Sequence, residues 1–340
     1  MKYHLLSAVI LAACGAATLV AAPPEGKGGG KGGGGEDPPA EPFVPAIAYF
    51  EELKTSKQLR LANRAGDQAC MVLETPDGSP KLRGFTYHAA TKRLAYSISE
   101  TGIFVTSWNG DPCKVNAPAR VRELSSGDHP EVMDFSPDGR YVAWTEPIHE
   151  YDGFGSAYLI YMYDFDQNVF FPVPLHQWGG RKEEWGVDGE WATSGIRFSP
   201  DFATSNELIF IGAPLDGSAG PYESIFAYDI GGSTPPRLVY DGANLSIEQF
   251  VSVTNPEGQG EARIILADRN SGELIQLGLD GTEVRRFTGS EPAFSCDNTE
   301  ILYKASAGKR RSGWYIAKVD ASGAELWSSG SVRWFDWFCP

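Results

Sequence analysis

The stretch that decides the fold is Met133-Asp134-Phe135-Ser136-Pro137-Asp138-Gly139-Arg140-Tyr141-Val142-Ala143-Trp144. It predicts two short apolar strands joined by a tight turn, because Pro, Asp and Gly favour the backbone angles that turns require. Similar stretches recur at 85–96, 196–210, 250–266 and 292–303. The anchor positions of the repeat, one of them near the C-terminus, are 87, 135, 198, 253, 294 and 338. Spacings of about 40 to 60 residues suit a unit of four short strands.

The remainder of each unit also has the pattern of antiparallel strands. An alternating third strand, such as 159–163 or 274–277, precedes a turn rich in Asp, Asn or Gly. These residues supply the positive φ angles of tight hairpins. A fourth strand follows, as at 237–240 and 284–287. With 39 Gly, 23 Pro and 21% charged residues, the chain of 340 residues is predicted to be all-β.

The repeat resembles that of the TolB-type β-propeller family, whose units read Phe-Ser-Pro-Asp-Gly followed by apolar strands. The resemblance implies an all-β, six-bladed β-propeller over residues 43–340. We expect 46–74 to supply strands two to four of one blade and 331–340 to supply its first strand, with Phe338 at the place of Phe135. Interlocked closure by the N- and C-terminal segments leaves no exposed sheet edge.

The N-terminal segment predicts an export signal followed by a tether. Residues 1–22 have a basic start and an apolar run too short to span a bilayer, which is typical of an export signal. Leu11-Ala12-Ala13-Cys14 resembles a bacterial lipobox, which implies lipidation of Cys14; the residue after it is not Asp, which implies the outer membrane. The alternative is ordinary cleavage near Ala22 and a soluble periplasmic or secreted protein. Residues 23–42, rich in Gly and Pro, predict a disordered tether.

Four cysteines remain after Cys14, and an even number in an exported protein favours disulfides. Cys296 and Cys339 both follow first strands of neighbouring units. Because first strands converge on the axis, a bond between these two would staple the closure. Cys70 and Cys113 both follow third-to-fourth-strand turns of neighbouring units, where a bond is open although outer strands diverge. Buried free thiols are the alternative for both pairs.

Candidate binding residues lie in connections that share one face of the predicted propeller. Second-to-third and fourth-to-first connections lie on this face and include the long segments 146–157 and 176–193, whereas the turns of the opposite face are expected to be mostly short. The candidate residues are Asp128, His129, His149, Tyr151, Asp152, His176, Trp178, Arg181, Trp185 and Trp191. Three Trp in one loop favour an aromatic recognition patch for a protein, peptide or glycan. Alternatively, these rings fold back over the blade as a satellite core.

Motifs for chemistry are absent from the sequence. It contains no nucleophile elbow, paired-histidine zinc motif or phosphate-binding loop. Asp164-Phe165-Asp166 resembles part of a calcium loop, but the Gly and distal Glu of that motif are missing, and a hairpin turn is expected there. We therefore expect no cofactor and no resident metal. The net charge of −15 disfavours nucleic acid and anionic lipid as partners.

Together these features predict a non-enzymatic binding or scaffold module of the cell envelope. The resemblance adds that TolB is a periplasmic partner of envelope proteins. TolB has an α/β domain before its propeller, whereas here a tether precedes the predicted propeller. The resemblance therefore implies the fold of TolB and not its complex with envelope partners. We expect a monomer that contacts the membrane through its lipid anchor only and faces the periplasm or the cell surface. The alternative is a propeller lyase or hydrolase that uses Asp128, His129 or His149 for acid–base or metal chemistry.

Overall fold

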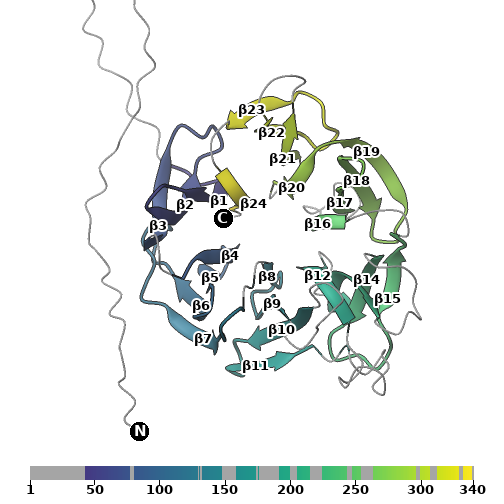
Figure 1. Ribbon diagram of the computed structural model, residues 1–340, viewed down its shortest axis with the longest axis horizontal. Coiled ribbons are helices and arrows are strands. Elements are labelled where there is room, and N and C mark those ends of the chain that lie inside the picture. Colours follow the sequence, from purple (N-terminus) through teal and green to yellow (C-terminus); the bar gives the residue numbers. More distant parts are fainter. Residues whose placement is uncertain are drawn as a thin grey trace, which may run out of the picture. The chain divides into compact units, whose positions relative to one another are not determined.

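The sheets follow the repeat read from the sequence. The computed structural model describes residues 43–76, 80–128, 130, 132–147, 158–173, 175, 191–199, 205–214, 224–242, 247–253, 263–295, 299–306, 312–328 and 332–338. Across these residues the strands form six antiparallel sheets of four strands each. The sheets stand around a common axis as the blades of a six-bladed β-propeller, with one end strand of each innermost (Figure 1). The predicted fold class is confirmed.

Each blade runs from an innermost first strand to an outermost fourth strand. The bounds, in that order, are: blade 1, β4 (Leu82–His88), β5 (Arg93–Ile98), β6 (Gly102–Ser107) and β7 (Ala119–Glu123); blade 2, β8 (Met133–Phe135), β9 (Tyr141–Pro147), β10 (Tyr158–Asp164) and β11 (Val169–Pro172); blade 3, β12 (Trp191–Phe198), β13 (Glu207–Pro214), β14 (Ser224–Asp229) and β15 (Arg237–Tyr240); blade 4, β16 (Ile247–Val253), β17 (Arg263–Asp268), β18 (Glu273–Gly278) and β19 (Glu283–Thr288); blade 5, β20 (Ser290–Phe294), β21 (Glu300–Ser306), β22 (Ser312–Lys318) and β23 (Glu325–Ser328); blade 6, β24 (Val332–Trp337), β1 (Ile47–Glu52), β2 (Ser56–Ala62) and β3 (Ala69–Pro76).

Blade 6 closes the ring by pairing the C-terminal strand with the N-terminal one. β24 runs antiparallel to β1, with Trp337 opposite Ile47. We call this pairing the seam. The interlocked closure expected from 46–74 and 331–340 is confirmed, but the predicted place of Phe338 is wrong by one residue. Phe135 lies opposite Val142 at the start of its second strand, and Trp337 holds the corresponding place opposite Ile47.

A similar shift of one residue occurs in blade 4. The sequence pattern places the anchor at Val253, whereas in the sheet Ser252 lies opposite Ile264, as Phe135 lies opposite Val142. Neighbouring residues of an inner strand point to opposite faces of the sheet. When both faces are packed against other blades, an apolar pattern does not reveal which residue faces which blade.

Packing between blades explains why the central strands are apolar on both faces. Each pair of neighbouring blades shares one hydrophobic cluster, and the six clusters form a closed ring. In blade 2, Val142 shares a cluster with Ile103 of blade 1, whereas the next residue, Ala143, shares one with Phe198 of blade 3. The alternation of side chains along a strand thus serves two interfaces at once.

The Ser-Pro-Asp-Gly turn of blade 2 is held by its own side chains. Ser136 Oγ donates to Asp138 Oδ1 at 2.6 Å and accepts the Tyr141 N–H at 2.8 Å. Gly139 has a φ of +70°, and a Cβ on it would lie 2.5 Å from His88 Nδ1 of blade 1. His88 Nε2 also lies 3.0 Å from Pro137 O. The close approach of the two first-to-second turns therefore requires glycine at this position.

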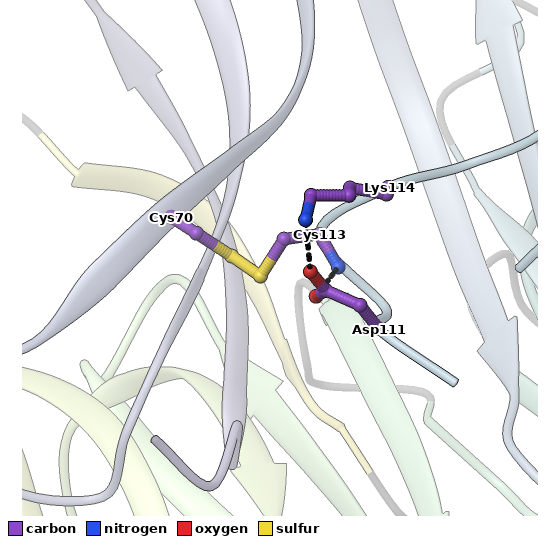
Figure 2. Close-up of a disulfide and its surroundings, with 4 residues drawn as sticks. All are labelled: Cys70, Asp111, Cys113 and Lys114. Atoms are coloured by element: carbon purple, nitrogen blue, oxygen red, sulfur yellow. Dashed lines mark hydrogen bonds and ion pairs between the residues drawn. A yellow bond between two sulfur atoms is a disulfide. The ribbon is translucent and has the colours of Figure 1, made fainter. Parts of the chain in front are cut away.

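A disulfide joins blade 6 to blade 1. Cys70, on β3, and Cys113 are bonded, with their Cα atoms 6.0 Å apart (Figure 2). Diverging outer strands made this pairing hard to expect. The structure resolves the difficulty because Cys113 does not belong to the outer strand β7 but to the connection 108–118, which reaches toward β3. Within that connection, Asp111 accepts the Cys113 N–H at 3.0 Å and pairs with Lys114 Nζ at 3.2 Å.

Several expectations concern residues outside the described part of the chain. These are the export signal 1–22, the lipobox cysteine Cys14, the tether 23–42 and the Cys296–Cys339 pair. Residues 43–340 form one compact unit. No described helix combines the length and apolar character needed to cross a membrane.

Candidate functional site

The topology fixes which connections share a face of the ring. Because the strands of a blade alternate in direction, second-to-third and fourth-to-first connections open on one face, which we call the loop face. Connections 148–157 (β9–β10), 173–190 (β11–β12), 215–223 (β13–β14) and 307–311 (β21–β22) belong to it. The opposite face is less uniform than expected, because it carries the connections 108–118, 199–206 and 254–262 as well as short turns.

Most sequence candidates lie in two connections of the loop face. His149, Tyr151, Asp152, His176, Trp178, Arg181 and Trp185 fall outside the described residues. Trp191 was expected in a loop, but it is the first residue of β12 and lies opposite Pro214 of β13. The Trp-rich connection therefore ends one residue before Trp191, and this tryptophan is part of the blade.

The roots of both connections are fixed in the core of blade 2. Val173 and Leu175, at the start of the Trp-rich connection, are buried and share a cluster with Ile160 and Ile196. The Val173 N–H donates to Ile160 O at 2.8 Å. The two candidate connections thus leave a single, well-packed blade, which is the usual setting of binding loops on a rigid scaffold.

An ion pair with a buried carboxylate supports the root of the 148–157 connection. Glu146, near the end of β9, accepts hydrogen bonds from Arg122 Nε at 3.1 Å and Nη2 at 3.0 Å and from Trp144 Nε1 at 2.7 Å. The hydrogen bond to Glu146 raises the pKa of Arg122. The guanidinium of Arg122 also lies over the rings of Tyr161 and Phe170. This network links the outer strand of blade 1 to blade 2 beneath the loop face.

Asp128 lies in a fourth-to-first connection, as expected, and is buried. Its Oδ2 accepts the Ser125 N–H at 2.6 Å, and its backbone carbonyl accepts the Glu100 N–H at 3.1 Å. The carboxylate thus shapes the turn before blade 2, while its neighbour His129 lies outside the described residues. Asp164 has a similar local role, because it accepts the Asp166 and Gln167 N–H groups and pairs with Arg140.

A charged cluster at the axis was missed by the sequence analysis. Asp134 on β8, Arg197 on β12 and Asp336 on β24 each directly precede the anchor residue of their innermost strand. All three side chains are half-buried. We call them the axial cluster. The sequence does contain a signal for the axial cluster. When the repeats are aligned on the anchors found in the structure, three of them carry a charged residue directly before the anchor.

Burial and mutual charge set the protonation of the axial cluster. Burial raises the pKa of Asp134 against the lowering effects of Arg197 and the Phe198 N–H, the like charge of Asp336 adds to the rise, and the result is a pKa of about 7. Burial likewise raises the pKa of Asp336, against a lowering effect of Arg197. The described residues contain no group of three or more His, Cys, Asp or Glu side chains that could hold a metal ion.

Comparison with known proteins supports the fold alone. No family model and no curated protein matches the sequence. TolB from Acinetobacter baumannii is similar in structure, with a TM-score of 0.51, 20% identity and coverage of 87% of this chain and 67% of that one. A protein named as a TolB from Agrobacterium tumefaciens gives a TM-score of 0.53 at 15% identity, covering 87% and 99%. The fold is therefore a TolB-type six-bladed propeller, as the repeat implies.

The same comparison shows that the fold does not determine the function. A chain of the COPII outer coat vertex on membranes matches with a TM-score of 0.54 at 13% identity, over 81% of this chain and 67% of that one. Propellers of one architecture serve unrelated tasks, so a function has to be argued from the sites of this chain.

Proposed function

We propose that the protein is a non-enzymatic binding module of the cell envelope that uses its loop face to hold a protein, peptide or glycan. The observation that carries this proposal is the placement of the two candidate connections. Both leave blade 2 on the same face, and the Trp-rich one begins at buried residues of the core. Aromatic rings and an Arg presented on such a scaffold are the residues that dominate binding energy at recognition surfaces.

Export is supported by the Cys70–Cys113 disulfide, because structural disulfides persist in oxidising compartments. We propose that the mature protein is anchored through a lipidated Cys14 and that 23–42 connects this anchor to the propeller. In this arrangement the propeller is a monomer held near the outer membrane, and the lipid is its only contact with that membrane. The net charge of −15 is consistent with the absence of binding to anionic headgroups.

An enzymatic role has less support. Of the residues considered for acid–base chemistry, Asp128 is described, and its carboxylate is engaged with the Ser125 N–H within its own turn. A carboxylate used in this way holds the backbone and is poorly placed to exchange protons with a substrate.

The proposal is tested by exchanging connections in the full-length exported protein. In one variant a Gly-Ser linker replaces 177–189, which carries Trp178, Arg181 and Trp185. In the matched control the same linker replaces 255–261, which lies on the opposite face. A photoreactive amino acid at Trp185 is expected to give a defined crosslinked species in whole envelopes, and one at Gly258 is expected to give none.

The linker variant of 177–189 should lose its partner in a pull-down while keeping the melting temperature of the control. Equal crosslinking from both faces would refute use of the loop face. A large fall in melting temperature in the 177–189 variant alone would instead show that the Trp residues cover the blade as a satellite core.

A further inference from the structure

The axial cluster results from the repeat itself. Each residue directly before an anchor pairs with the residue that follows the anchor's partner on the second strand, as Asp134 does with Ala143 and Asp336 with Ala48, so these residues lie at one level around the axis. Going round the ring from blade 6, they are Asp336, Thr86, Asp134, Arg197, Val251 and Ala293. The charged residues belong to blades 6, 2 and 3. Blades 2 and 3 are neighbours, and blade 1, with the uncharged Thr86, separates Asp336 from Asp134. At this level the charge of one guanidinium, that of Arg197, acts on both carboxyl groups.

Specific hydrogen bonds hold the cluster between blades. Asp134 Oδ2 accepts the Phe198 N–H at 2.7 Å, which connects blade 2 to blade 3. Arg197 Nη1 donates to Ile196 O at 3.0 Å and to Met133 O at 3.4 Å. Asp336 Oδ1 accepts the Trp337 N–H at 2.9 Å. The backbones of three blades therefore fix the relative positions of these groups.

The charge balance of the cluster is incomplete. When both carboxylates are ionised, one guanidinium faces two negative charges at half-buried positions, and unbalanced charge with reduced access to water is unfavourable. Among described side chains, Arg197 and Asp336 are the charged groups that act on Asp134. A proton on one carboxyl would leave one carboxylate and one guanidinium, which is the balanced state.

We propose that Asp134, Arg197 and Asp336 form a proton-binding site on the propeller axis, which holds one proton near neutral pH and releases it under mildly alkaline conditions. The site is independent of the loop face and of the partner bound there. The folded protein thus has two protonation states, which differ in the charge carried by the inner strands of blades 2, 3 and 6 at this level of the axis.

The sign of the effect on stability follows from the raised pKa of Asp134. An unfolded Asp has a pKa of about 3.9, so at intermediate pH the folded state binds a proton that the unfolded state does not. The stabilising contribution is complete below pH 4 and is lost as the pH rises through about 7. Between pH 5 and 8 the folding equilibrium constant should fall by roughly 100-fold from this site, about 2.7 kcal/mol.

The test is the pH dependence of urea unfolding between pH 5 and 8.5 for the full propeller. Asp134→Asn should remove most of the 100-fold decrease. Asp280→Asn is the matched control, because the Asp280 carboxylate caps an exposed turn through Thr282, which lowers its pKa and leaves nothing to titrate in this range. An unchanged slope in Asp134→Asn, or a wild type without the decrease, overturns the proposal.

Two further variants keep the proposal testable if Asp134→Asn does not fold. Asp336→Asn removes the like charge and should move the transition to lower pH, whereas Arg197→Gln removes the counter-charge and should move it to higher pH. Infrared spectra should show a protonated carboxyl group at pH 6 that disappears by pH 8.5. A purely structural role would not shift the transition in opposite directions, so shifts in one direction only, or none, contradict the assignment.

Discussion

Removal of the Cys70–Cys113 bond offers the sharpest test of how the ring is held together. The bond joins residues 43 positions apart in the sequence. In the chain-entropy model, a cross-link of this span removes about 13 cal/mol/K from the unfolded ensemble, which corresponds to about 4 kcal/mol at 25 °C. Cys70 packs against the apolar cluster between blades 6 and 1, so alanine is a better replacement than serine.

The measurement compares the wild type with Cys70→Ala/Cys113→Ala by urea denaturation under oxidising conditions. We expect the double variant to lose about 4 kcal/mol of unfolding free energy. The disulfide should also lower the m-value of the wild type, because a cross-linked unfolded chain exposes less surface. A loss below about 1 kcal/mol would refute the reasoning, since it would mean that the unfolded chain already keeps these cysteines together.

Reductant provides the control for this experiment. Adding it to the wild type reduces every disulfide, so it should reproduce the loss seen in the double variant and add the loss from any second bond. Adding it to the double variant reports on Cys296 and Cys339, which are also 43 positions apart in the sequence. A further loss of about 4 kcal/mol is expected from the predicted bond between them. An unchanged unfolding curve would show that this second pair is not bonded.

Three other predictions address the turn, the ion pair and the anchor. Gly139→Ala should cost at least about 2 kcal/mol, because the added Cβ would collide with His88 and the backbone there has a positive φ. Gly110→Ala has a φ of +81° but open space around it, so it should cost about 1 kcal/mol. Equal losses in thermal unfolding would contradict the contact with His88. Glu146→Ala should cost about 2 kcal/mol, because it leaves the buried Trp144 Nε1–H without its acceptor and the partly exposed Arg122 without its partner. Glu123→Ala, in the exposed pair with Arg120, should cost less than about 1 kcal/mol; similar unfolding midpoints for the two variants would count against the network. Cys14→Ser should abolish incorporation of labelled palmitate while Cys70→Ser keeps it, and label that survives in Cys14→Ser would exclude the anchor.

The repeat could be predicted from the sequence because its turns carry strong local signals. Ser136, Asp138 and Gly139 form their turn through contacts within a few residues, so the turn can be recognised from the local sequence alone. The phase of the anchors in blades 4 and 6 could not be predicted in the same way. In blade 4 the anchor is the polar Ser252, so a search for apolar residues selects its neighbour Val253. In blade 6 the neighbours Trp337 and Phe338 are both aromatic and both buried, so hydrophobicity does not distinguish them.

The axial cluster was hidden for a different reason. Asp134, Arg197 and Asp336 belong to three repeats, and each charge taken alone is an ordinary polar residue beside an aromatic one. Their relation depends on closure of the ring, which brings β24 to the same level as β8 and β12. The Cys70–Cys113 disulfide, in contrast, could be proposed from the sequence as one possible pairing. Its geometry could not be predicted, because it depends on how far the connection 108–118 extends toward β3.

Closure also links the seam to the proton site, because Asp336 lies on β24 beside Trp337. Trp337 is buried between blades 5 and 6, and its Nε1 donates to Ala293 O at 3.0 Å. Trp337→Ala should therefore loosen the seam, weaken the repulsion between Asp336 and Asp134 and move the alkaline transition to lower pH, as Asp336→Asn does. A disulfide acts mainly on the unfolded chain, so Cys70→Ala/Cys113→Ala should lower stability at every pH and leave the transition where it is. The pH profile of urea unfolding separates these effects. An equal shift in both variants would show that the disulfide holds the native seam in place, and that the entropic account of its 4 kcal/mol is wrong.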